Sequence, residues 1–323
     1  MSADTPAPAA TTADGTAPPV LAEVVRSGFV ESRHRGSLVL LDADGGVEFA
    51  LGDPAAPVFP RSANKPMQAA AMLRAGLDLS GERLALASAS HSGEPFHRAL
   101  VRTMLAEHGL TPDDLQCPPD LPLDEGERAA YLAAGGVPER LAMNCSGKHT
   151  GMLAACLAAG WPTATYRDPE HPLQRLVRDV VEEAAGEPVA AVGVDGCGAP
   201  LMAIGLVGLA RAFRHFVRAA DTTPEGRVAA AMRAHPEYVG GTGRLDTELM
   251  GAVPGALSKT GAEGVQAVAL PDGRALAFKA DDGAKRALGV ILSRALAMTG
   301  VDWKTAAPVL GGGAEVGEIR ATF

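Results

Sequence analysis

Apolar positions along this chain recur with two different periods. Short runs that alternate with polar residues, or that are continuously apolar between turn residues, indicate β-strands. The sequence Asp-Gly-Gly at 44–46 supplies a hairpin turn, because glycine adopts positive φ without steric cost. A second hairpin turn is expected at Pro-Asp-Gly, 271–273. The strands predicted in this way are 21–25, 36–41, 47–51, 190–194, 265–270, 275–279 and 315–321.

Longer segments carry apolar residues with the spacing of helices. Glycines at 76 and 109 follow two of these segments and are typical helix stops. The short apolar segment 84–89 is interpreted as a strand that leads into a loop rich in serine. The helices predicted from this period are 63–75, 96–108, 149–159, 172–185, 201–213, 225–234 and 282–299.

The order of these elements favours an α/β (α+β) fold. Strands at both ends of the chain with helices between them predict one mixed, mainly antiparallel sheet built from both termini, flanked by helices and a helical region. No linker or repeat divides residues 20–323, so a single domain is expected there. Residues 1–19 are rich in Ala, Pro and Thr and are predicted to form a disordered tail.

Composition and charge narrow the classes of function. The 323 residues are 47% hydrophobic and 21% charged, as in ordinary globular proteins, and the net charge is −9. This acidity and the lack of a Lys/Arg cluster argue against a nucleic-acid partner, and no apolar run is long enough for a membrane span. The first residues do not resemble a secretory signal, so we expect a cytoplasmic protein with its four cysteines reduced.

Ser62 and Lys65 form the first candidate for catalysis. Three residues apart at the start of a predicted helix, they lie on one face of its first turn, where a neutral lysine can take the proton of a serine hydroxyl. The alternative is a helix-capping serine beside a solvated lysine. Lys259-Thr260-Gly261 follows near the other end of the chain, and penicillin-binding serine acyltransferases use both elements in this order.

Three further stretches carry reactive side chains: a serine-rich loop at 88–92, the residues 145–148 and the turn with Cys197. Ser88, Ser90 and Ser92 crowd one loop, either as ordinary turn residues or as a hydroxyl between the two lysines. Cys145 stands before a predicted helix next to Lys148, where its thiol should be acidified and suit a nucleophile or a metal ligand. A tight turn with a buried cysteine is the alternative.

Cys197 follows the predicted strand 190–194, a usual place for sites in α/β sheets. The spacing of Cys145 and Cys197 matches no standard zinc motif. The glycine-rich stretch 240–244 lacks the strand–turn–helix context of a phosphate-binding loop, so we do not assign phosphate binding to it.

Together these stretches resemble the rhizobial-type (class 3) L-asparaginases, a family related in fold to serine β-lactamases and serine glutaminases. The resemblance runs from about residue 21 to the end of the chain. Six stretches in matching order are more specific than any one of them. They are 61–66, 89–92, 144–149, 195–197, 235–237 and 255–257 ahead of Lys259.

The resemblance implies a serine β-lactamase-like fold, a homodimer and two serine–lysine tandems. Ser62 would pair with Lys65, and Ser90 with Lys259. It also implies a Zn²⁺ site that is not required for catalysis in every case, and lysine would have to bind the metal as the neutral amine. The metal ligands would be Cys145, Lys148 and Cys197, and the substrate contacts Arg61, Asp195 and His149.

The sequence departs from the family pattern at three places. Cys117-Pro118 stands where a His-Pro loop is often found, and Thr242 stands where a glutamate is often seen. Gly311-Gly312-Gly313 replaces a more polar segment. These departures concern the access of substrate rather than the serine–lysine residues.

The expected activity is hydrolysis of the side-chain amide of free L-asparagine to L-aspartate and ammonia. Ser62 is favoured as the nucleophile, with Ser90 relaying protons, and the reverse assignment stays open. A serine glutaminase or a β-lactamase-like acylase is the alternative among enzymes. A non-catalytic zinc- or amino-acid-binding protein is the alternative from another class.

Overall fold

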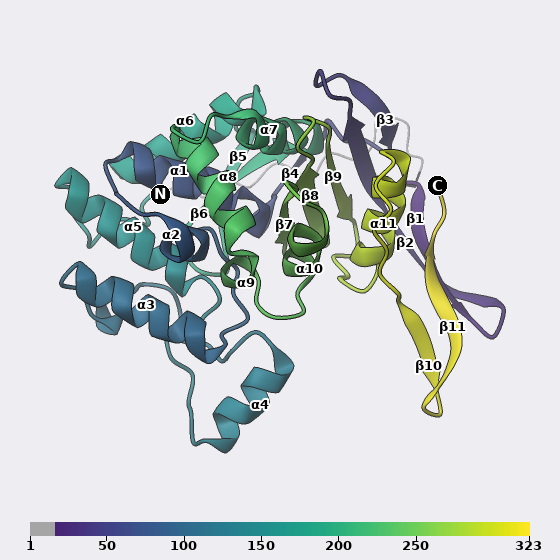
Figure 1. The fold of residues 1–323 in the computed structure, drawn as a ribbon, viewed down its shortest axis with the longest axis horizontal. Helices are drawn as coiled ribbons and strands as arrows, with labels where there is room; N and C mark the ends of the chain where they lie inside the picture. The colour runs from purple at the N-terminus through teal and green to yellow at the C-terminus, as the bar shows by residue number, and fades with distance from the viewer. Residues whose placement is uncertain (1–16) are drawn as a thin grey trace, which may run out of the picture.

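The computed structural model describes residues 17–323, so most of the predicted N-terminal tail lies outside the described residues. Its main feature is an eight-stranded sheet in the order β10-β11-β1-β2-β9-β8-β7, with β3 paired to β2 (Figure 1). Every pairing in it is antiparallel. The strands are β1 (Val20–Arg26), β2 (Phe29–Leu41), β3 (Val47–Leu51), β7 (Leu257–Gly261), β8 (Val265–Ala269), β9 (Ala275–Ala280), β10 (Pro308–Gly311) and β11 (Ala314–Ala321).

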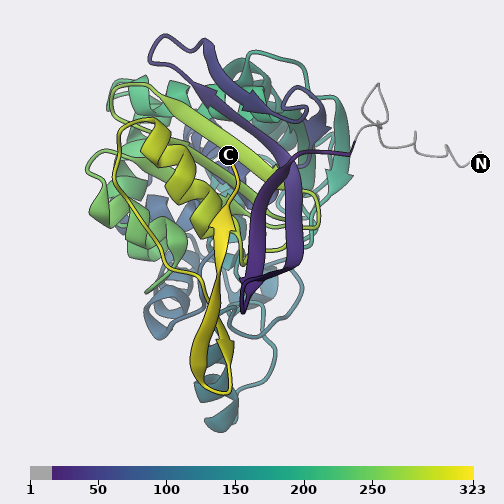
Figure 2. The same cartoon turned by 90° about the vertical axis from the view of Figure 1, so that its right-hand side faces the viewer.

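The sheet is apolar on both faces and is covered on both. Along β2, Val39 and Leu41 belong to the larger core, whereas Leu38 and Leu40 belong to a second core on the other side. This alternation follows from the two-residue period of a strand. Helix α11 (Leu288–Met298) covers the second face (Figure 2), and α7 (Leu206–Arg218) packs against β2, β8 and β9 on the first.

A helical region adjoins the α7 side of the sheet. In Figure 1 it occupies the half of the molecule away from α11 and the C-terminus. A small second sheet, β4-β6-β5, lies with it. The remaining elements are β4 (Pro57–Val58), η1 (Arg61–Asn64), α1 (Lys65–Arg74), α2 (Gly81–Ala87), α3 (Pro95–Glu107), η2 (Pro112–Asp114), α4 (Glu125–Ala133), α5 (Ser146–Ala159), α6 (Pro172–Ala185), β5 (Ala191–Val194), β6 (Pro200–Gly205), α8 (Pro224–Ala234), α9 (Pro236–Val239) and α10 (Leu245–Ala252).

The sheet built from both termini is confirmed, as are both hairpins and most of the predicted helices. The helix predicted at 282–299 begins only at Leu288, and two other segments differ from the prediction in type. Residues 84–89 lie in and just after helix α2 rather than in a strand, and the helix predicted at 201–213 divides into strand β6 and helix α7. All six residues of β6 are buried, and a short, continuously apolar run has the same pattern in a buried strand as in a buried helix.

The described residues contain no helix long and apolar enough to cross a membrane. The four cysteines are all buried and form no disulfide.

The fold brings the two lysine motifs together by packing β7 against η1. Gly261, the last residue of β7, lies so close to this turn that a Cβ atom there would overlap with the carbonyl oxygen of Pro60. Glycine is therefore required at this position by close approach of two backbones, since neither backbone can move without shifting the sheet or the turn.

Gly261→Ala is expected to lower the free energy of unfolding by about 1–3 kcal/mol, because overpacking here displaces backbone atoms. Gly251→Ala is the matched control. Gly251 lies in α10 with open space around its Cβ position, so alanine should leave stability unchanged or raise it. Denaturant unfolding of both variants measures the difference, and equal stability of the two would contradict the close approach.

Candidate active site

A small cavity of about 60 Å³ lies where β7, η1 and the loop after α2 meet. Ser62 from η1, Ser90 from that loop and Lys259 from β7 all line it. Three of the four predicted catalytic residues therefore share one cavity, although they are far apart in sequence. The other lining residues are Leu123, Asn144, Gly240, Arg244, Asp246, Thr260, Gly261, Ala262 and Lys285.

The turn that presents Ser62 has an unusual backbone. Residues Arg61–Asn64 form a 3₁₀ turn, and the α-helix begins only at Lys65. Arg61 has a φ of 53°, which is a strained conformation for a bulky side chain. Its guanidinium donates to Asp195 Oδ1 at 2.8 Å, which ties the turn to the end of β5. Ser62 and Lys65 thus stand at a junction between two kinds of helix.

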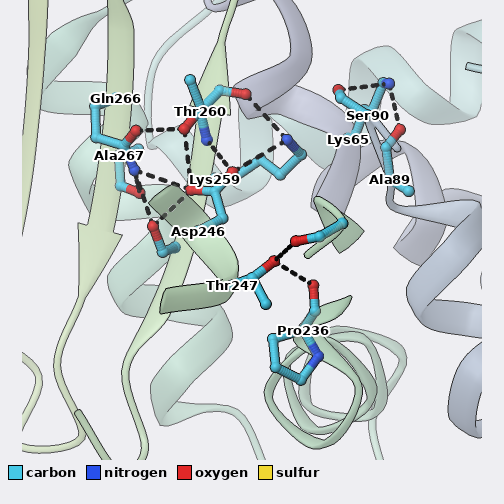
Figure 3. A network of polar contacts seen from close by, with 12 residues as sticks. Lys65, Ala89, Ser90, Pro236, Asp246, Thr247, Lys259, Thr260, Gln266 and Ala267 are labelled. Carbon is cyan, nitrogen blue, oxygen red and sulfur yellow. Dashed lines mark hydrogen bonds and ion pairs between the residues drawn. The ribbon is translucent and has the colours of Figure 1, made fainter. Parts of the chain in front are cut away.

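Lys65 is buried and bonds to Ser90 rather than to Ser62. Its Nζ lies 2.8 Å from Ser90 Oγ and 3.1 Å from Cys145 Sγ, and it also donates to the carbonyl oxygen of Ala89 (Figure 3). No described residue forms a hydrogen bond with Ser62 Oγ, which leaves this hydroxyl free toward the cavity. The hydrogen bond therefore joins the lysine of one predicted tandem to the serine of the other.

Lys259 is a buried lysine whose pKa is lowered toward neutral pH. Its Nζ is 3.5 Å from Asp246 Oδ2 and 3.0 Å from the carbonyl oxygen of Thr260. Burial, together with the charges of Lys65 and Arg244, lowers the Lys259 pKa to about 8 against the opposing effect of Asp246. Near this pH a lysine can both accept and return a proton.

Asp246 holds Lys259 in place, and the sequence reasoning missed it. The buried carboxylate accepts hydrogen bonds from Ser258 Oγ at 2.7 Å, the Thr260 N–H at 2.9 Å and Gln266 Nε2 at 3.2 Å (Figure 3). Burial alone would raise the Asp246 pKa, but Lys259 and these donors hold it below its usual value. Its partners lie 12 to 20 residues further along the chain, so no local motif marks it.

The predicted metal ligands also come together. Lys148 Nζ, in the first turn of α5, lies 3.0 Å from Cys197 Sγ in the turn after β5. Cys145 caps the N-terminus of α5 and lies beside both. All three side chains are buried.

The acidified thiol is Cys197 and not Cys145, contrary to the sequence prediction. A hydrogen bond from Cys145 and the charge of Lys148 hold the pKa of Cys197 well below its usual value, against the effect of burial. The hydrogen bond to Cys197 and burial raise the Cys145 pKa. Two adjacent thiols cannot both ionise easily, so the pKa values of the pair move apart.

The residues predicted to contact substrate lie outside the cavity that holds the serines. His149 is wholly buried, and its Nδ1 bonds to Tyr166 Oη at 2.6 Å. Arg61 and Asp195 are paired with each other at 2.8 Å, next to the Cys197 turn. These three side chains therefore surround the thiol cluster.

The thiol cluster fits a soft divalent metal in its chemistry. It offers two thiol sulfurs, one amine and the Nε2 atom of His149, which is buried without a hydrogen-bond partner. The charges of Cys197, Cys145 and Asp195 raise the Lys148 pKa although burial opposes this, so a metal would have to displace a proton from the amine. Residues 17–323 contain no group of three or more His, Cys, Asp or Glu side chains arranged to hold a metal ion.

Comparison with known protein families decides the assignment. The model of the family L-asparaginase II matches residues 22–321, nearly the whole of the described chain. The chain belongs to the L-asparaginase II family. This confirms the resemblance seen in the sequence, and it makes the chain an amidohydrolase whose substrate is a small molecule.

Solved structures match most of this asparaginase-family chain at low sequence identity. A β-lactamase from Mycobacterium bovis is 15% identical, with a TM-score of 0.44 over 82% of this chain and 95% of that one. EstCE1, a hydrolase with promiscuous acyltransferase activity, is 12% identical, with a TM-score of 0.44 over 81% of this chain and 93% of that one. A search of curated proteins finds no match.

Asp246→Asn is expected to lower the Lys259 pKa below its value of about 8, because Asp246 is the charge that raises it. With Lys259 as the base, asparagine hydrolysis by the wild type should rise as pH passes about 8, where the lysine loses its proton. In the Asp246→Asn variant, hydrolysis should begin to rise at a pH that is lower by roughly one unit or more.

The pH dependence of kcat/KM measures this shift. Asp272→Asn is the matched control, because Asp272 pairs with Arg274 at the surface, outside the cavity. If kcat/KM of Asp246→Asn rises at the same pH as in the wild type, or at a higher pH, Asp246 does not set the charge of Lys259.

Proposed function

We propose that the protein hydrolyses the side-chain amide of free L-asparagine to L-aspartate and ammonia. The observation that carries this proposal is that Ser62, Ser90 and Lys259 line one cavity in a chain of the L-asparaginase II family. Two hydroxyls beside a lysine of lowered pKa supply the groups that acyl transfer requires.

In the proposed mechanism Ser62 attacks the amide carbonyl and Lys259 accepts the serine proton. Ser62 Oγ has no hydrogen-bond partner among the described residues, and Lys259 lies in the same cavity with a pKa of about 8. Ser90 passes its proton to the leaving nitrogen and takes one from Lys65, to which it is bonded. Water then attacks the acyl-serine ester and gives a proton back to Lys65 through Ser90, while Lys259 returns its proton to Ser62 Oγ.

The oxyanion of the tetrahedral intermediate would be stabilised by the main-chain N–H of Ser62, since the neighbouring N–H of Ala63 donates to the Pro60 carbonyl oxygen at 3.1 Å. The main-chain N–H of Ser90 donates to the Val239 carbonyl oxygen at 3.0 Å. That group is therefore engaged and is not assigned this role.

We also propose that Cys145, Lys148 and Cys197 bind Zn²⁺. The mutual contacts of these buried side chains support this assignment, and the low pKa of Cys197 favours a thiolate ligand. When bound, the metal would supply a fixed positive charge beside Arg61 and Asp195. The residues themselves already join the start of α5 to the turn after β5.

A homodimer is proposed on the family resemblance alone. Light scattering on the purified protein measures the mass of the assembly directly.

Ser62→Ala is expected to reduce kcat for ammonia release from asparagine by about 10³-fold or more, as loss of a nucleophile does. Ser90→Ala should also lower kcat, by removing the proton relay. Ser80→Ala is the control, because Ser80 is an exposed serine that does not line the cavity. Near wild-type turnover in Ser62→Ala would contradict the assignment and favour Ser90, which already contacts Lys65.

The same assay with glutamine and with a chromogenic β-lactam separates the alternatives. Faster ammonia release from glutamine would favour a glutaminase, and β-lactam turnover would favour an acylase. Binding of asparagine without release of ammonia would favour a binding protein.

About one zinc ion per chain is expected in the purified protein, and Cys197→Ala should lose it. The expected loss follows from removing the most acidic sulfur. Cys156→Ala is the matched control, since Cys156 is buried in the core elsewhere on α5. Elemental analysis by mass spectrometry measures the metal, and a wild type without zinc would refute the site.

A further inference from the structure

A second cavity opens directly beside the one that holds the serines. It has a volume of about 320 Å³ and lies between α10, β7 and the start of α11. The two cavities share Arg244, Asp246, Thr260 and Lys285 in their walls. These residues therefore mark the junction between a small inner chamber with the serines and a larger outer chamber.

The junction carries an excess of positive charge. Arg244, Lys285 and Lys259 line the inner chamber, and Asp246 is its one acidic residue among those that the structure describes. Asp246 is already engaged by Lys259 and by three neighbouring donors. Its charge is therefore not available to balance Arg244 and Lys285.

Arg244 and Lys285 form no ion pair and no side-chain hydrogen bond with any of residues 17–323. Other cationic side chains nearby do have hydrogen-bond or ion-pair partners, so the lack of partners at Arg244 and Lys285 is informative. Arg286, in the outer chamber, bonds to His34 Nε2 at 3.0 Å and Ser32 Oγ at 2.8 Å. Arg61, the cation that the sequence suggested for substrate binding, is held by Asp195 at 2.8 Å.

We propose that Arg244 and Lys285 bind the α-carboxylate of the substrate at this junction. This inference rests on the proposed function and adds a substrate requirement to it. Guanidinium and ammonium groups without partners beside a cavity are suited to a carboxylate, and the arginine can bind both oxygens at once. The side-chain amide would then point into the inner chamber, toward Ser62 and Ser90.

This placement restricts the class of substrate. The substrate must carry a free carboxylate, and the side chain beyond it must fit the inner chamber, which is the smaller of the two. Amides whose carboxylate is blocked would lose the contact with both cations. Amides with a longer side chain would hold the carbonyl out of register with the serines.

Kinetics of Arg244→Leu and Lys285→Met test the inference. Each substitution is expected to raise KM for asparagine by about 10-fold or more, because a charged hydrogen bond to the carboxylate is lost. The kcat value should change by only a few-fold, and Arg244→Lys should recover part of the affinity. Lys304→Met is the control, since Lys304 is an exposed lysine paired with Asp302 at 2.9 Å and lines neither chamber.

Calorimetric binding of succinate and of neutral succinamide tests the same inference without turnover. The wild type should bind succinate more tightly than succinamide, and Arg244→Leu should abolish this preference. A wild type that shows the preference but releases no ammonia from asparagine would refute the proposed function and leave the carboxylate site standing. Asparagine turnover with an unchanged KM in both variants would overturn the carboxylate site alone.

Discussion

Three wholly buried lysines constrain the centre of this molecule. Lys65, Lys148 and Lys259 are each about 1% exposed. An ammonium group removed from water costs several kcal/mol unless it gains close partners. Each lysine finds its partners on segments distant in sequence, such as the Ser90 loop, the Cys197 turn and Asp246. The site therefore depends on the fold, and the fold depends on pairing these amines.

Lys148 and Lys259 reach different electrostatic states because their surroundings differ. Lys148 contacts Cys197, whose pKa is lowered. The negative charge there raises the pKa of Lys148, so the amine keeps its proton. Lys259 has one carboxylate but also two neighbouring cations, and burial brings its pKa to about 8. The same residue type thus serves as a fixed charge at one position and as a titrating amine at another. Pairs of groups whose pKa values are driven apart in this way are a feature of acid–base sites.

The cation-rich junction complements this arrangement. Arg244 lowers the pKa of Lys259 from the side where the two chambers meet, and it has no acidic partner of its own among the described residues. A carboxylate bound there would bring the negative charge that the walls lack. Recognition of the substrate and the charge of the lysine would then be linked through one small region of the protein.

The sequence by itself determined the family, both hairpins, the sheet built from both termini and the residues of the serine–lysine and thiol clusters. These depend on local periods and on short motifs in a given order. Only the tertiary structure decided which lysine meets which serine, because packing brings the loop after α2, which carries Ser90, onto the buried amine of Lys65. It also decided that β6 is a strand, that Cys197 is the acidic thiol, and that Asp246 and Arg244 belong to the site. Each of these depends on burial and on charges brought together from distant segments, and neither is encoded in the local spacing of residues.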